Sequence, residues 1–105
     1  MAGTDNIRTE LLLSVQRALL GAVPANLRSV SCDWEETEIR LRFIFDGEIR
    51  DDDREDASVA ATEVIADFIE PWTITQEIER LDYPSDMRDR TLQLQAYQRK
   101  EASSV

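Results

Sequence analysis

The chain has no histidine and a single cysteine among its 105 residues. Without histidine it cannot form a Ser-His-Asp triad, use an imidazole as a general base or bind a metal through imidazole. Cys32 alone cannot form an internal disulfide or a zinc cage of thiolates, so the cysteine count gives no sign of an oxidising compartment. The three glycines, Gly3, Gly21 and Gly47, are too few and too far apart for a glycine-rich phosphate loop.

Long hydrophobic runs are also missing. The longest apolar stretches, such as residues 11–13 and 18–20, are far shorter than the ~20 residues that span a bilayer. No secretory signal is visible at the start of the chain, so we expect a cytoplasmic protein. Hydrophobic residues make up 42% of the chain, which is enough for one core at this length. We expect a single domain over residues 1–105, with an ordered core at about 5–99 and a polar tail at 100–105.

Negative charge dominates the middle of the chain. Acidic residues number 22 against 12 basic residues, which gives a net charge of −10. Residues 33–70 contain fourteen of the acids and four of the bases, so this segment carries the whole net charge. Such a field repels nucleic acid and anionic lipid, so neither is an expected partner, and it favours a basic protein. A plainer interpretation is that the charge keeps a small domain soluble.

Hydrophobic periodicity predicts two helices. Residues 5–20 place apolar side chains at spacings of three and four, which is typical of one buried helix face, and Pro24 blocks continuation. Residues 51–69 return to this spacing, and Pro71 ends the segment. The start of this second helix is crowded with carboxylates, which complement the free amides and the positive end of the helix dipole.

Alternation of apolar and polar side chains predicts four strands, at residues 27–34, 38–45, 72–81 and 91–98. The order α-β-β-α-β-β predicts an α+β fold. We expect a two-layer sandwich in which two helices cover one face of a four-stranded, mainly antiparallel sheet. The other face would be polar and largely solvated, with Ser29, Ser31, Gln95 and Tyr97 among its side chains.

The most conspicuous candidate site is the segment 46–56, with seven carboxylates in eleven positions. Asp51, Asp53 and Glu55 alternate as calcium ligands do in an EF-hand, but the glycine of the sixth loop position is missing and a helix would splay these side chains. A Ca²⁺ or Mg²⁺ site is therefore a minor hypothesis, and we expect no cofactor. No pair of carboxylates stands out for acid–base chemistry, so we expect no enzyme activity.

A docking surface for a cationic partner would include anchors outside this segment. Trp72 follows Pro71 and could sit at the rim of an interface, whereas Trp34 is in phase with core positions. Tyr97, in the last predicted strand, is a second possible anchor. The expected partner-binding residues are Asp33, Glu35, Glu36, Asp46, Glu48, Asp51, Asp52, Asp53, Glu55, Asp56, Trp72 and Tyr97.

Four strings of the sequence together resemble a known group of proteins: LRSV at 27–30, FDGEI at 45–49, ATEVIADF at 61–68 and YQRKE at 97–101. Over roughly residues 11–101 the chain is similar to a family of small acidic bacterial proteins, mostly uncharacterised. Some members are associated with immunity in contact-dependent inhibition and other polymorphic toxin systems. The resemblance implies an immunity protein that neutralises a cognate basic toxin. Its motifs are structural and the loop at 83–90 departs from the pattern, so no binding residue is transferred.

Two functions of different classes remain open. The first is a non-enzymatic immunity protein that binds a basic toxin through its acidic surface, chiefly by electrostatic attraction. The second is a housekeeping adaptor or a homodimer of unknown role, which would pair through an edge of its sheet. Reversing Asp51, Asp52 and Asp53 to lysine would abolish the first kind of binding and leave the second unchanged.

Overall fold

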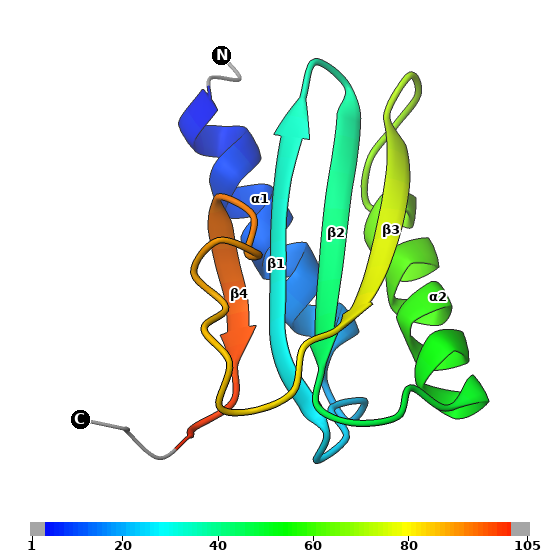
Figure 1. Ribbon diagram of the computed structural model, residues 1–105. Coiled ribbons are helices and arrows are strands. Elements are labelled where there is room, and N and C mark those ends of the chain that lie inside the picture. Colours follow the sequence, from blue (N-terminus) through cyan, green and yellow to red (C-terminus); the bar gives the residue numbers. More distant parts are fainter. Residues whose placement is uncertain (1–3, 102–105) are drawn as a thin grey trace.

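The structure is a computed structural model that describes residues 4–101. The described residues form two helices and four strands, in the order α1 (Thr4–Ala18), β1 (Leu27–Glu35), β2 (Glu38–Phe45), α2 (Asp51–Ala66), β3 (Thr73–Arg80) and β4 (Leu94–Gln98) (Figure 1). The α+β class and the element order agree with the prediction from the sequence. No helix within these residues is long and apolar enough to cross a membrane.

The sheet is mixed, with the strand order β3-β2-β1-β4. β1 pairs antiparallel with both β2 and β4, but β2 and β3 run parallel. Two of the three strand pairs are antiparallel, as a mainly antiparallel sheet requires, and the β2–β3 pair makes the sheet mixed. The reason is α2, which returns the chain from the end of β2 to the end where β2 begins, so that β3 starts beside the start of β2. β3 and β4 consequently lie at opposite edges of the sheet and form no hairpin (Figure 1).

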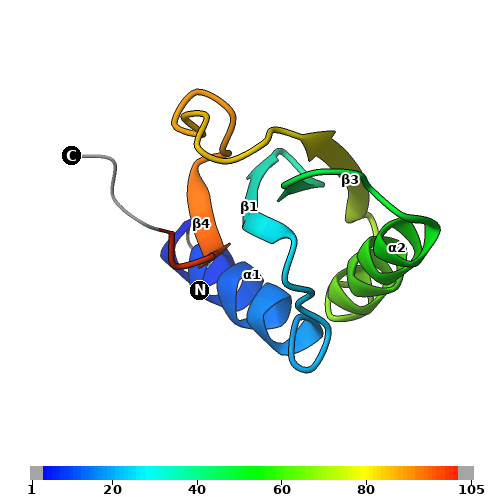
Figure 2. The ribbon, with the colours of Figure 1, turned by 60° about the horizontal axis from the view of Figure 1, so that its bottom comes forward.

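The hydrophobic core lies between the helices and the sheet. Both helices are on the same side of the sheet in Figure 2. Leu11 of α1, Val64 of α2 and Leu41 of β2 are fully buried in one cluster. Ile39 and Phe43 flank Leu41 on the same face of β2, as the alternation of this segment predicts.

The opposite face of the sheet is partly covered by the segment 81–93, which connects β3 to β4 (Figure 2). Ser29 and Ser31 of β1 are fully buried there. The backbone amide of Leu92 donates to Ser31 Oγ at 2.9 Å, and the side-chain amide of Gln95 donates to Ser29 Oγ at 2.7 Å. The prediction of a largely solvated face is therefore wrong at β1, because small hydroxyl side chains leave room for a crossing segment and bind it.

A β-bulge decides which face of the sheet Tyr97 lies on. Val30 pairs with Tyr97 but Ser31 pairs with Gln95, so Ala96 is an extra residue in β4. Because Val30 belongs to the core, the bulge brings Tyr97 to the helix side of the sheet, where it is half-buried against the core. Strict alternation, which places Tyr97 on the polar face, is wrong here for that reason.

Candidate functional site

The acids that the sequence singles out lie at the two opposite ends of the sheet. Glu35 and Glu36 are at the turn between β1 and β2, whereas the segment 46–56 runs from the far end of β2 into the first turns of α2 (Figure 1). β2 alone has eight residues, which span roughly 26 Å at ~3.3 Å per residue. The predicted residues therefore form two separate surfaces instead of one.

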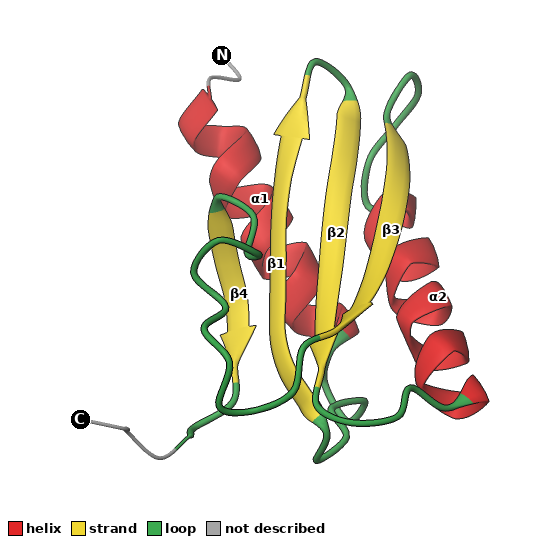
Figure 3. Cartoon of the chain, viewed as in Figure 1, coloured by secondary structure: helices red, strands yellow, loops and turns green. Residues whose placement is uncertain are grey.

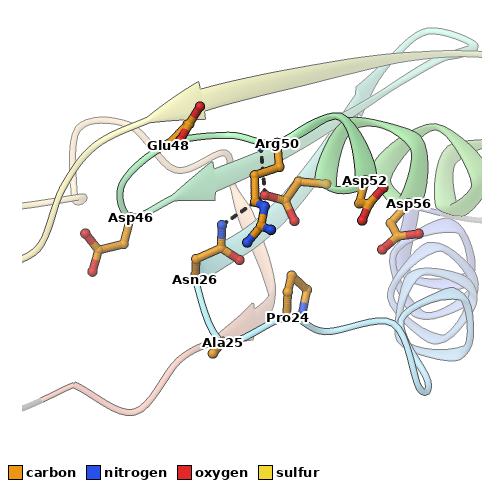
Figure 4. A pocket seen from close by; sticks show the side chains of 9 residues that line it. Pro24, Ala25, Asn26, Asp46, Glu48, Arg50, Asp52 and Asp56 are labelled. Carbon is orange, nitrogen blue, oxygen red and sulfur yellow. Dashed lines mark hydrogen bonds between the residues drawn. The ribbon is translucent and has the colours of Figure 1, made fainter.

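At the end of the sheet where α2 begins, the surface contains an open hollow of about 790 Å³ (Figure 4). Its walls are the connections α1–β1 and β2–α2 and the first turns of α2, which meet at this end of the molecule (Figure 3). We call this hollow the acidic groove, because five of its nine lining residues carry carboxylates. The lining residues are Pro24, Ala25, Asn26, Asp46, Glu48, Arg50, Asp52, Asp53 and Asp56.

Three carboxylates of the acidic groove form no ion pair with the part of the chain that the structure describes. Glu48, Asp52 and Asp56 are exposed, and none of them forms an ion pair with any residue in 4–101. Asp52 and Asp56 are four residues apart in α2, a spacing that puts both on one face of the helix. They form one wall of the groove, and Glu48 lies on the β2–α2 connection, on the other side of Arg50 (Figure 4). All three are thus available to an incoming cation.

Asp53 lines the same groove but serves the fold. Its Oδ2 accepts a hydrogen bond from the backbone amide of Arg50 at 3.0 Å and another from the side-chain amide of Asn26 at 3.0 Å. The residue is only 6% exposed. Asp53 is the third residue of α2, where a carboxylate reaches back to the N-cap amide. It therefore fixes the start of α2 against the α1–β1 connection and so positions Asp52 and Asp56.

Asp46 belongs to a network of charged side chains beside the groove. Arg99 donates from Nη2 to Asp46 Oδ2 at 3.0 Å and to Glu101 Oε2 at 2.9 Å. Glu101 also accepts two hydrogen bonds from Arg28, from Nε at 2.8 Å and from Nη2 at 2.9 Å. Arg99 further donates to the carbonyl of Ala25 at 2.9 Å. The chain end that the sequence assigns to a polar tail is thus bound, as far as Glu101, to the start of β1 and to the groove wall.

The arginines of this network lower the pKa of both carboxyls. The hydrogen bond from Arg99, supported by the backbone amide of Tyr83, holds the pKa of Asp46 below its ordinary value. The hydrogen bonds from Arg28 and then Arg99 do the same for the pKa of Glu101. A carboxyl with a lowered folded pKa contributes stability above its unfolded pKa and loses it as the pH falls through the folded pKa.

We expect Glu101→Gln to reduce the free energy of unfolding at neutral pH, and to reduce it progressively less below pH ~4.3, the ordinary pKa of glutamate. Acid protonates Glu101 of the native protein and weakens its hydrogen bonds from Arg28, whereas glutamine does not titrate. Urea unfolding of both proteins at about pH 7, 5 and 3 measures the difference between them. General effects of acid on a chain with net charge −10 largely cancel in this difference. A difference that is constant or grows toward low pH contradicts the assignment.

The hairpin end of the sheet is arranged differently. Asp33 is half-buried and accepts two hydrogen bonds from Arg40, at 2.9 Å to Oδ1 and 2.7 Å to Oδ2, so its charge is compensated within the fold. Glu35 and Glu36 are exposed, and Glu36 has a left-handed φ of 55° in the turn. Trp72 lies at this end as well, half-buried, with its ring centroid 5.4 Å from that of Phe68.

Tyr97 lies away from both acidic surfaces. It is half-buried on β4 and lines a hollow with Gln16 and Leu19 of the α1 region. Neither Tyr97 nor Trp72 is among the residues that line the acidic groove. The anchors that the sequence suggests are therefore separated from the groove.

Residues 4–101 contain no group of three or more carboxylates and thiols placed to hold a metal ion. The alternating acids Asp51, Asp53 and Glu55 point different ways at the start of α2, with Asp53 buried and the other two exposed. Burial, together with the nearby Asp33 carboxylate, raises the pKa of the Cys32 thiol to about 12. This cysteine is therefore a small core side chain and no thiolate nucleophile.

Comparison with curated proteins finds no match to the chain. A family model described as MafI2 immunity protein matches residues 8–101. The match includes all of the chain from the first half of α1 through β4 to Glu101, and so it covers the acidic groove and the network beside it. It confirms the resemblance to immunity proteins of bacterial polymorphic toxin systems. The chain therefore belongs to the MafI2 immunity protein family.

Proposed function

We propose that this protein neutralises a basic toxin by binding it, without catalysis, and that the acidic groove is the surface that binds. Membership of an immunity protein family supports the class of function. The observation that carries the choice of surface is the arrangement of Glu48, Asp52 and Asp56. These are three exposed carboxylates around one hollow, and none forms an ion pair within residues 4–101.

The partner that fits this groove is a cationic protein surface, such as the nucleic-acid-binding surface of a nuclease. An arginine or lysine of the toxin would enter the groove and meet carboxylates that form no ion pair within the described residues. Covering such a toxin surface would keep the substrate of the toxin away from it. Because the groove is open to water, each ion pair contributes modestly to affinity, and the summed charge acts mainly on the association rate and on specificity.

The other acids have different places in this proposal. Asp51 and Glu55, exposed on α2 near the groove, extend its negative field, and Asp46 contributes while it stays paired with Arg99. Asp53 positions the helix start. The acids and Trp72 of the hairpin end stay outside the proposed surface. We further propose that the chain acts as one domain, because both helices and the central strands contribute to one core, and that it acts in the cytoplasm.

The association rate with a cognate toxin tests this mechanism. We expect the rate constant to fall steeply as salt rises from about 0.1 M to about 1 M, because the screening length shrinks from ~10 Å to ~3 Å. The dissociation rate should change much less. Stopped-flow mixing of the full chain with the purified toxin measures both. An association rate constant that does not depend on salt contradicts electrostatic capture.

Arg50 offers a test of where the toxin is captured. It is the one base among the residues lining the groove, and its side chain extends into the hollow (Figure 4). We expect Arg50→Gln to raise the association rate constant at low salt, since it makes the groove more negative and leaves the backbone amide bond to Asp53 in place. Arg8→Gln, which changes the net charge equally at the far end of α1, is the matched control. Equal rates for the two variants would argue for attraction by net charge alone.

A further inference from the structure

The edge strand β4 is unusual because it contains no charge. Its outer side pairs with no strand of the described chain, and residues 93–98 read QLQAYQ. Sheet edges that must stay unpaired usually carry charged side chains, prolines or bulges, and β4 has only the bulge at Ala96. The other edge, β3, contains Glu77, Glu79 and Arg80. The two edges therefore differ in how well they are protected against pairing.

An uncharged stripe of the α1 region continues this edge. Thr9, Leu13, Gln16 and Leu20 follow one another at spacings of four, three and four, and all four side chains are exposed. Leu20 is 79% exposed. Gln16 and Leu20 line a hollow of about 200 Å³ together with Tyr97 of β4, which places the stripe beside the strand. We call β4 and this stripe the neutral edge.

We propose that the neutral edge is the contact surface for a second copy of this chain. Two chains that each carry a net charge of −10 repel one another, and this repulsion is weaker where the two surfaces in contact carry no charge. Contact through the β3 edge would bring two α2 helices with acidic first turns close together. A basic toxin, by contrast, gains no attraction from an uncharged surface.

The geometry of the strand also suits a symmetric pair. β4 is antiparallel to β1, so a second β4 related by a two-fold axis would continue the sheet with another antiparallel pair. The same residues of both copies then form the contact, and Leu13 and Leu20 of each copy become buried in it. α1 and β4 lie on one side of the molecule and α2 and β3 on the other (Figure 1). Pairing through the neutral edge therefore leaves the α2 side of both copies uncovered.

Salt distinguishes this association from toxin binding. Screening weakens the repulsion between two acidic chains, so the dissociation constant of the dimer should fall by about tenfold or more between about 0.1 M and about 1 M salt. Toxin binding through the acidic groove changes in the opposite direction. Sedimentation equilibrium of the full chain at several salt concentrations measures the dimer directly.

Substitution locates the contact. We expect Leu20→Glu, which introduces a carboxylate at the neutral edge, to raise the dissociation constant of the dimer by about tenfold or more. Ile69→Glu is the matched control, because it adds the same charge at an aliphatic side chain that is 83% exposed in the α2–β3 connection. Far-UV circular dichroism of both variants checks that the fold is retained.

Three outcomes would overturn the proposal. The first is a chain that stays monomeric at every salt concentration up to about millimolar protein, where even weak contacts associate. The second is a dimer that survives Leu20→Glu or that is lost in Ile69→Glu. The third is a native chain that is monomeric together with a Leu20→Glu variant that no longer binds the toxin. This result would show that the neutral edge binds the toxin and not a second copy. Loss of toxin binding by groove variants alone leaves this proposal intact.

Discussion

Replacing Glu48, Asp52 and Asp56 together with lysine should raise the dissociation constant of the toxin complex by about a hundredfold or more. Each substitution turns an attraction for a cationic partner into a repulsion, and like charges across an interface cost several kcal/mol. Every ~1.4 kcal/mol is a factor of ten in affinity. The fold should tolerate the change, because all three side chains are exposed. A lysine at the start of α2 costs only about 0.3–1 kcal/mol against the helix dipole.

The matched control reverses three exposed acids at the opposite end of the sheet, Glu35, Glu36 and Glu70. This variant has the same net charge as the groove variant, so a difference between them reports position. Calorimetric titration of each variant with the toxin measures the dissociation constant. The survival of cells that express the toxin together with each variant measures protection. The account fails if the hairpin variant loses binding while the groove variant keeps it. Asp53 stays out of the set, because its loss would disturb the start of α2.

The second large effect concerns stability. We expect Arg28→Ala to lower the free energy of unfolding by about 3–5 kcal/mol, the range for removing one partner of a buried ion pair. Arg28 is 2% exposed. Besides its two bonds to Glu101 it donates to the carbonyl of Leu81 at 2.6 Å and to that of Ser85 at 3.0 Å. Its guanidinium carbon lies 5.8 Å from the ring centroid of Tyr83. One side chain thus connects β1, the segment 81–93 and the chain end.

Arg88→Ala is the control for this prediction. The Arg88 side chain is 89% exposed and forms its ion pair with Asp86 at 2.6 Å, in water. Pairs of this kind contribute about 0–1 kcal/mol. Urea unfolding of both variants at neutral pH gives the two losses. If the Arg28 variant loses no more than the Arg88 variant, the buried network does not hold the segments together.

Local patterns in the sequence predict the helices and strands but not how the strands pair. The apolar spacing of residues 5–20 and 51–69 and the alternation in 27–34 and 38–45 come from side chains that face one core. Strand direction depends on where α2 delivers the chain, which no local pattern contains. The sequence therefore does not predict the parallel β2–β3 pair. It does not predict the bulge at Ala96 for a related reason, since the bulge arises from pairing with β1.

The sequence predicts the candidate site only as a set of acidic residues. The structure shows that some of these acids are exposed and that others, buried or half-buried, stabilise the fold. Asp52 and Asp53 are neighbours of the same type, yet the ~100° rotation between successive helical residues puts one in water and the other against Asn26. A carboxylate three positions after the N-cap was the available signal for Asp53. Arg28 and Glu101 had no such signal. They are 73 positions apart, and only the folded chain brings them together.

Hydrogen–deuterium exchange of the native protein with and without its toxin tests the central claim most directly. If the acidic groove binds the toxin, the complex should show slower amide exchange at residues 25 and 26 and in residues 46–56. Exchange at the hairpin turn, residues 35–37, and in β4 should stay as it is in the free protein. Slower exchange confined to the hairpin turn or to β4, with residues 46–56 unchanged, would contradict the account.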